Sequence, residues 1–326
     1  MNINLYKKLH TEGLISEQTL EKIVERDKNS LFSLHWELKT LLYLGVTLLS
    51  TGLGILIYKN IDTIGHQVIL LFIAAICIGC FFYCVKNRKP FSREKVKSPS
   101  SFDDYILVLG CLSLLSFLGY LQFQYHVFGD NYGLATFIPM LILFYVAYEF
   151  DHIGVLSMGI TNLAIWLGAT ITPFTILSNG LYSNNSLIIP YLFLGLLLLS
   201  AAYLSERYNF KKHFKFTYQN FGLNISFIAL FTGYFSSHEN PLNFLWLVAV
   251  LILAFVLYRD ALKNKSFYFL LLVVLYAYTA ISTMVVRILF NIDSEAAFVM
   301  VLLYFIGSAI GLIMALVQLN KKIKDI

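Results

Sequence analysis

Polar side chains inside long apolar segments are the residues of this sequence that could bind a ligand. Four of them are Asn162, Asn224, Thr279 and Arg287. An amide or charged group at membrane depth costs a few kcal/mol unless it faces protein or water. Each is therefore expected either to line a polar cavity or to form a hydrogen bond between helices. In a shared cavity Arg287 would hold an anionic group; its alternatives are an ion pair with Asp293 and a side chain extended to the membrane interface.

Three cysteines share one face of a helix, because Cys77, Cys80 and Cys84 are spaced i, i+3 and i+7. A metal site would require thiolates, which are costly in lipid. Buried free cysteine usually acts as a small apolar packing residue, and we predict that role here. The seven His residues are scattered without ligand spacing. No metal and no other cofactor is expected.

A charged turn is formed by Glu149, Asp151 and His152. Such residues could serve a proton-coupled gate, but charged residues concentrate in turns in any case. We therefore expect a solvated turn. The sequence shows no Ser/His/Asp set, phosphate-binding loop or zinc-protease motif, so an enzyme is not expected.

Glycines in the apolar segments indicate where helices approach each other closely. Gly307 and Gly311 form a small-xxx-small motif, which allows two helix backbones to come together. We expect it to pack inside the bundle, with a dimer contact as the alternative. Gly45 and Gly52 are assigned the same packing role in the first apolar segment.

The elements that must position these residues are apolar helices. With 58% hydrophobic and 13% charged residues, the 326-residue chain has too little polar surface for a water-soluble domain. A membrane-spanning helix needs about 20 apolar residues. Ten segments approach that length: 41–58, 66–85, 105–123, 133–148, 153–171, 187–204, 216–235, 242–258, 267–290 and 296–319. The predicted fold is all-α, a polytopic transmembrane helical bundle of about ten spans.

The distribution of basic residues predicts the orientation. If the N-terminus is cytosolic, all 24 Lys and Arg residues except Lys59 and Arg287 fall in cytosolic segments. Basic loops are retained in the cytosol, so both termini are expected there. Because topology explains the net charge of +5, no nucleic-acid partner is expected.

Residues 1–38 are polar and helix-like, and they are predicted to form a small cytosolic hairpin ahead of the bundle of residues 39–326. Gly13 can end a first helix and Ser16 can cap a second. The hairpin is too small to be stable alone, so its apolar residues are expected to dock on the bundle, on a second copy of the chain or on a cytosolic partner protein. These docking residues are Leu9, Leu14, Ile15, Leu20 and Ile23.

The N-terminal residues resemble a known family. The run Leu9-His-Thr-Glu-Gly-Leu-Ile-Ser-Glu-Gln18, followed by Leu44-Gly45, Gly52 and Asn60-Ile61-Asp62, is similar to the bacterial membrane proteins grouped as domain of unknown function 2157. Ile61 stands where that family has an aromatic residue. The resemblance implies a bacterial inner-membrane location and no established activity, so no catalytic residue is carried over.

Two functions fit these patterns. The first is transport or flipping of a small or lipid-linked molecule through a polar cavity in the bundle. The second is an interaction or sensor protein that docks a partner through its N-terminal hairpin. Membrane lipid is a partner in both. A cavity shared by the four polar residues would favour the first, and separate contacts between helices would favour the second.

Overall fold

The computed structural model describes residues 9–10, 12–28, 65–96, 101–129, 132–171, 187–236, 241–290 and 296–325, with isolated positions between 41 and 59. The chain divides into two compact units, Met1–Ile69 and Leu70–Ile326. The predicted boundary near residue 38 and most of the predicted span 41–58 lie outside the described residues.

The smaller unit contains helix α2, Glu17–Lys28. Gly13 adopts φ +72°, and its N–H donates to the His10 carbonyl at 2.9 Å, so the chain turns at this glycine as predicted. The predicted Ser16 cap is also present, because the Thr19 N–H donates to Ser16 Oγ at 3.4 Å. Leu14 is 68% exposed, and the side chain of Ile23 lies outside the described residues. The first helix of the predicted hairpin is described only at residues 9 and 10, so it stays a prediction.

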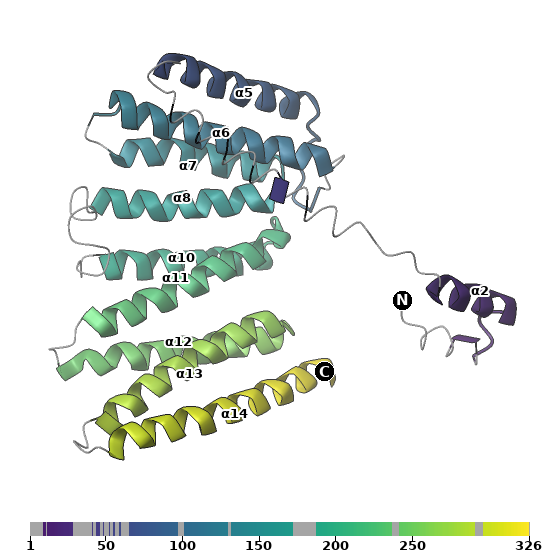
Figure 1. The fold of residues 1–326 in the computed structure, drawn as a ribbon, viewed down its shortest axis with the longest axis vertical. Helices are drawn as coiled ribbons and strands as arrows, with labels where there is room; N and C mark the ends of the chain where they lie inside the picture. Colours follow the sequence, from purple (N-terminus) through teal and green to yellow (C-terminus); the bar gives the residue numbers. More distant parts are fainter. Residues whose placement is uncertain are drawn as a thin grey trace. The chain divides into compact units, whose positions relative to one another are not determined.

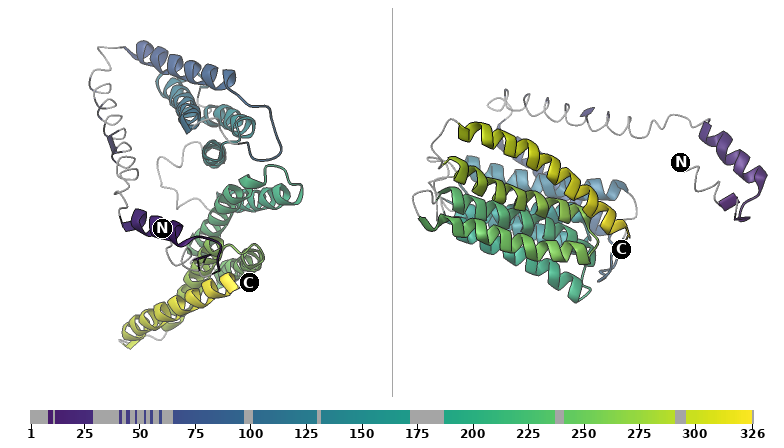
Figure 2. Two further views of the ribbon diagram at one scale, coloured as in Figure 1. Left: turned by 90° about the vertical axis from the view of Figure 1, so that its right-hand side faces the viewer. Right: turned by 90° about the horizontal axis from the view of Figure 1, so that it is seen from below.

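The larger unit is a series of long helices that follow one another side by side in chain order (Figure 1). They are α5 (His66–Lys86), α6 (Ser101–Tyr125), α7 (Tyr132–Glu149), α8 (Ile153–Ile171), α10 (Ile188–Arg207), α11 (Lys215–Ser236), α12 (Phe244–Lys263), α13 (Phe267–Phe290) and α14 (Ala296–Asp325). The short 3₁₀ helices η2 (Lys212–Phe214) and η3 (Pro241–Asn243) precede α11 and α12. Helices α11 to α14 run roughly parallel to one another in the right-hand view of Figure 2.

The described part of the chain is all-α, with ten α-helices and no strand, as the sequence predicts. Eight helices are long and apolar enough to cross a membrane: α5, α6, α7, α8, α10, α12, α13 and α14. Helix α11, the predicted span 216–235, is not among the eight because amides such as Gln219 and Asn224 lower its hydropathy. The structure therefore supports eight candidate spans, and the total of ten stays a prediction.

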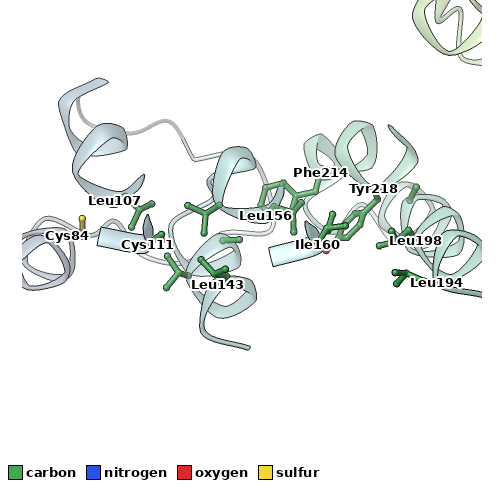
Figure 3. Close-up of a cluster of buried hydrophobic side chains, with 14 residues drawn as sticks. Cys84, Leu107, Cys111, Leu143, Leu156, Ile160, Leu194, Leu198, Phe214 and Tyr218 are labelled. Carbon is green, nitrogen blue, oxygen red and sulfur yellow. The ribbon is translucent and has the colours of Figure 1, made fainter. Parts of the chain in front are cut away.

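Helix α11 lies between two hydrophobic clusters and contributes residues to both. The first cluster joins α5, α6, α7, α8, α10 and η2 to the first turn of α11 at Tyr218. In Figure 3 its side chains extend in a row from Cys84 through Leu156 to Leu198. The second cluster joins α11 to α12 and α13, with Phe227, Val250 and Leu270 fully buried. Protein neighbours thus cover much of α11, so this helix needs less apolar surface toward lipid than its neighbours do.

Glycines bring α10 and α11 into close contact. A Cβ at Gly195 would lie 2.8 Å from the backbone N of Ser226, and one at Gly222 would lie 2.9 Å from the carbonyl O of Gly195. Only glycine allows this approach, because real Cβ atoms essentially never come so near a backbone atom. Around Gly45, Gly52, Gly307 and Gly311 a Cβ would meet no described atom within 4 Å. The packing role of these four glycines stays a prediction.

Candidate functional site

Helix α13 carries a polar face near its C-terminal end. Thr279, Thr283 and Arg287 follow one another at intervals of four residues, so they line one side of the helix. The hydroxyls of Thr279 and Thr283 donate to the carbonyls of Leu275 and Thr279 at 2.9 and 2.8 Å. Their backbone hydrogen bonds make these hydroxyls tolerable in an apolar environment, and each oxygen can still accept.

A shallow, open cleft of about 490 Å³ lies along this face. Its walls are mostly apolar and aromatic, and they come from α11, α13 and α14: Tyr234, Phe235, Tyr278, Thr279, Ser282, Thr283, Val286, Arg287 and Phe305. Two hydrogen bonds hold α13 to α14 beside it, Tyr278 OH to Ser308 Oγ and Ser282 Oγ to Tyr304 OH, both at 3.0 Å. The volume of this cleft lies within the range of about 300–1,000 Å³ found for small-molecule sites.

Arg287 is held at the end of the cleft by neutral groups. Its Nη1 donates to Asn243 Oδ1 at 2.7 Å and to Tyr234 OH at 3.4 Å, and its guanidinium lies 5.9 Å from the centre of the Tyr234 ring. Asn243 is 2% exposed, and its Nδ2 has no hydrogen-bond partner among the described residues. No carboxylate in the described part of the chain pairs with Arg287; the predicted alternative partner, Asp293, lies outside it. The guanidinium has five N–H donors, so several remain for an anionic group.

The other two residues of the predicted cavity lie elsewhere. Asn162 is buried between α7 and α8, where its Nδ2 donates to the Thr136 carbonyl at 2.8 Å. Asn224 links α11 to α13, because its Oδ1 accepts from Tyr276 OH at 2.8 Å. Of the four predicted residues, the structure brings together Thr279 and Arg287 alone. The two asparagines form the hydrogen bonds between helices that were the alternative to a cavity.

A buried charge cluster lies at the opposite ends of the helices, where the α7–α8 turn meets the α10–α11 turn. Asp151, with φ +59°, places its Oδ1 3.0 Å from Lys211 Nζ and 2.6 Å from His213 Nε2. Its Oδ2 accepts from the Val96 N–H at 2.6 Å. The Asp151 and Lys211 side chains are both 1% exposed. The ammonium is within ion-pair distance of the carboxylate without the alignment of a hydrogen bond.

The predicted solvated turn is therefore wrong for Asp151. The carboxylate is removed from water and joins three segments of the chain: the loop before α6, the α7–α8 turn and the turn before η2. Such a pair is stable only when both partners are present, because one buried charge alone is strongly unfavourable. Glu149 has a more conventional role in a partly exposed salt bridge, 3.0 Å from Arg88 Nη1.

His152 caps helix α8. The Val155 N–H donates to His152 Nδ1 at 3.1 Å, which satisfies a donor that the helix itself leaves free. Burial lowers the pKa of the His152 imidazole below its ordinary value, and the carboxylate of Asp104, 4.0 Å from Nε2, raises it in part. The neutral imidazole is the form that accepts this hydrogen bond, because a protonated imidazole has two donors and no acceptor.

The cysteines pack against neighbouring helices. Cys77, Cys84 and Cys111 are buried, and a Cβ at Gly110 would lie 3.0 Å from Cys80 Cβ. Cys77 Sγ lies 3.8 Å from the Gly110 carbonyl. Among the described residues no three His, Cys, Asp or Glu side chains are grouped as metal ligands would be. The predicted role of these cysteines as packing residues agrees with this contact between α5 and α6.

In the described part of the chain, eight long apolar helices and two hydrophobic clusters between them define a polytopic α-helical membrane protein. Residues 7–156 match the family described as "Predicted membrane protein (DUF2157)". This match confirms the resemblance drawn from the N-terminal residues and extends it through α7 to the start of α8. Comparisons with curated proteins and with solved structures found no match.

Proposed function

We propose that the protein binds an anionic amphiphile, either a small molecule or a lipid-linked one, in the cleft along α13, and that it transports or flips this molecule across a bacterial inner membrane. The observation that carries the proposal is Arg287. It is a guanidinium at the end of an apolar cleft, neutral partners hold it, and its remaining donors are available.

The two parts of the cleft suit the two parts of an amphiphile. A phosphate or carboxylate would accept from the guanidinium in a charge-assisted hydrogen bond, which is stronger than a bond between neutral groups. Hydrocarbon would lie against aromatic walls such as Phe235 and Phe305. An ionisable residue within a membrane-spanning helix is by default a candidate functional residue.

The test is the lipid that copurifies with the full chain. Native mass spectrometry of protein extracted in a mild detergent should detect bound anionic lipid, and Arg287→Gln should lower the number of bound lipids by about one per chain. Arg259→Gln is the matched control, because Arg259 is an exposed arginine near the C-terminal end of α12. Its guanidinium lies 5.2 Å from the centre of the Phe255 ring. Equal lipid occupancy in the Arg287 variant and the wild type would refute the proposed site.

Flipping is tested separately from binding. The full chain is reconstituted into vesicles that contain a fluorescent anionic lipid, and dithionite quenching reports the lipid that reaches the outer leaflet. We expect flipping that Arg287→Gln slows and Arg259→Gln leaves unchanged. Binding without flipping would leave a receptor or sensor for the same amphiphile, and flipping at the same rate in the Arg287 variant would refute the role of this residue.

Partner docking through the N-terminal segment is the second candidate. It is favoured by Leu14, a large apolar side chain that is 68% exposed beside the turn at Gly13. It is also favoured by Asn162 and Asn224, because these two amides form separate contacts between helices and do not line a cavity shared with Arg287. Leu14→Glu and removal of residues 1–38 should both abolish an assembly that depends on this segment. Light scattering of the purified protein and identification of copurifying proteins provide the readout. Unchanged assembly and unchanged partners in both variants would eliminate this role.

A further inference from the structure

A second concave site lies near the buried charge cluster of Asp151, at the ends of the helices opposite to Arg287. It has a volume of about 540 Å³ and is lined by Arg93, Glu94, Lys95, Asn209, Lys212 and His213. Three of these side chains are always cationic at neutral pH and one is a carboxylate, so the site carries an excess of positive charge. We call it the basic pocket.

The basic pocket is built from two segments more than 100 residues apart in sequence. The loop between α5 and α6 supplies Arg93 to Lys95, and the turn between α10 and η2 supplies Asn209. The Lys211 N–H donates to the Arg93 carbonyl at 2.9 Å and fixes the two segments together.

The buried carboxylate of Asp151 contacts both segments that form the basic pocket. It accepts from the Val96 N–H on one wall and lies 2.6 Å from His213 Nε2 on the other. Its ion pair with Lys211 holds the turn between the two walls. These contacts fix the backbone that carries the cationic residues, so less backbone freedom is lost when a ligand binds between them.

Exposed aromatic residues stand close in sequence to those that line the basic pocket. Tyr208 is 69% exposed, Phe91 51% and Phe210 38%, and the rings of Phe91 and Phe210 lie 6.4 Å apart. They occur where α10 ends and where α5 has just ended. Aromatic rings are enriched at the level of lipid head groups, and basic pockets at that level bind acidic phospholipids. A soluble anion would gain nothing from the neighbouring apolar surface.

We propose that the basic pocket binds the phosphate of an anionic phospholipid, with the start of its acyl chains against Phe91 and Phe210. The phosphate lies among Lys95, Lys212 and Arg93 and replaces part of their hydration. The site is independent of the proposed transport cleft. A phospholipid bound here would hold the three segments that meet at Asp151 at the head-group level of one leaflet.

The experiment measures binding of a fluorescent short-chain phosphatidylglycerol to the full chain in detergent micelles. Arg287→Gln serves as the background, so that the cleft along α13 does not contribute. The double variant K95Q/K212Q should bind about 30-fold more weakly, because each basic residue near the surface contributes about a factor of five to ten. The matched control R259Q/K263Q removes the same charge from the end of α12 and should change the affinity less than about threefold. Circular dichroism verifies that both variants are folded.

Glu94 provides a variant that should gain affinity. Glu94→Gln removes the one carboxylate of the basic pocket, and phosphatidylglycerol should then bind about five times more tightly. A damaged fold cannot produce such a gain. If Glu94→Gln leaves the affinity unchanged or weaker, the phosphate does not lie in this pocket and the proposal is overturned.

Competitors identify the source of the phosphate. Unlabelled phosphatidylglycerol should displace the probe, whereas phosphatidylcholine, glycerol phosphate and inorganic phosphate at equal concentrations should not. Displacement by inorganic phosphate would show a site for a free anion and would overturn the assignment to lipid. Equal loss of affinity in K95Q/K212Q and R259Q/K263Q would show attraction to net charge without a site, and it would also overturn the proposal.

Discussion

Replacing Lys211 with methionine should destabilise the protein by about 3 kcal/mol, because it leaves the carboxylate of Asp151 buried without its counter-charge. Methionine has a similar length and no charge, so the substitution removes the ammonium while creating little cavity. The burial of both partners makes the expected loss of stability large. Both side chains are 1% exposed, so water screens neither charge in the native state.

The other contacts of Asp151 determine where in the range of about 3 to 5 kcal/mol each variant falls. In Lys211→Met the carboxylate keeps the Val96 N–H and His213 Nε2, both at 2.6 Å, so the lower end is expected. In Asp151→Asn the oxygen that accepts from Val96 is retained, but the ammonium of Lys211 loses its carboxylate. We expect the upper end for Asp151→Asn. The double variant D151N/K211M buries no unpaired charge and should lose about 2 kcal/mol or less.

The free energies can be measured by titrating the full chain in mixed micelles with sodium dodecyl sulfate and following helix content by circular dichroism. Lys212→Met is the matched control, because Lys212 is the next residue in sequence and is exposed. It should change the free energy of unfolding by less than about 0.5 kcal/mol. Two results would refute the reasoning: a Lys211→Met variant as stable as Lys212→Met, or a double variant whose loss equals the sum of the two single losses.

Three further predictions use the same titration. Replacing His152 with alanine should cost about 1 kcal/mol through loss of the α8 cap. The pKa of His152 is lowered in the folded protein, so the unfolded chain binds the proton more readily. Stability should therefore fall as the pH drops below about 6.5. His152→Asn should keep the cap and lose this pH dependence, and a His152→Asn variant with the pH profile of the wild type would contradict the role given to His152. Gly195→Ala forces a Cβ to 2.8 Å from a backbone atom of α11 and should lower the free energy of unfolding by about 2 kcal/mol. The Cβ of Gly307→Ala meets no described atom within 4 Å, so this variant should be as stable as the wild type. Similar losses of stability in both variants would disprove the close α10–α11 contact. Tyr276→Phe removes the hydrogen bond to Asn224 and should cost about 1 kcal/mol, and no loss would mean that the bond contributes nothing in the membrane.

Helix positions were predictable because lipid imposes a simple rule on each segment by itself. A spanning helix must satisfy its own backbone and must be apolar over its whole length, so apolar runs and their polar ends mark it. The predicted spans 153–171 and 267–290 have the same limits as α8 and α13. Helix α11 departs from the rule because its polar residues face other helices. It is well buried although its hydropathy is low.

The candidate site was predictable only in part. Thr279 and Arg287 lie on one helix, and their spacing of eight residues places them on one face whatever surrounds them. Asn162 and Asn224 lie on helices whose mutual position no local pattern reports. Each amide has the same cost at membrane depth whether it lines a cavity or bonds to a neighbouring helix, so the sequence left both outcomes open.

The sequence by itself determined that this chain contains several membrane-spanning helices and that residues 7–156 are similar to the DUF2157 family. Composition and periodicity act within single segments, and they are sufficient for that conclusion. Only the tertiary structure decided which charges leave water. Lys211 and Lys212 are adjacent and chemically identical, yet Lys211 is buried against Asp151, which lies 60 residues earlier in the chain, and Lys212 lines the basic pocket. The physical reason is that burial of a charge depends on a partner from a distant turn, and that pairing exists only after the helices have packed.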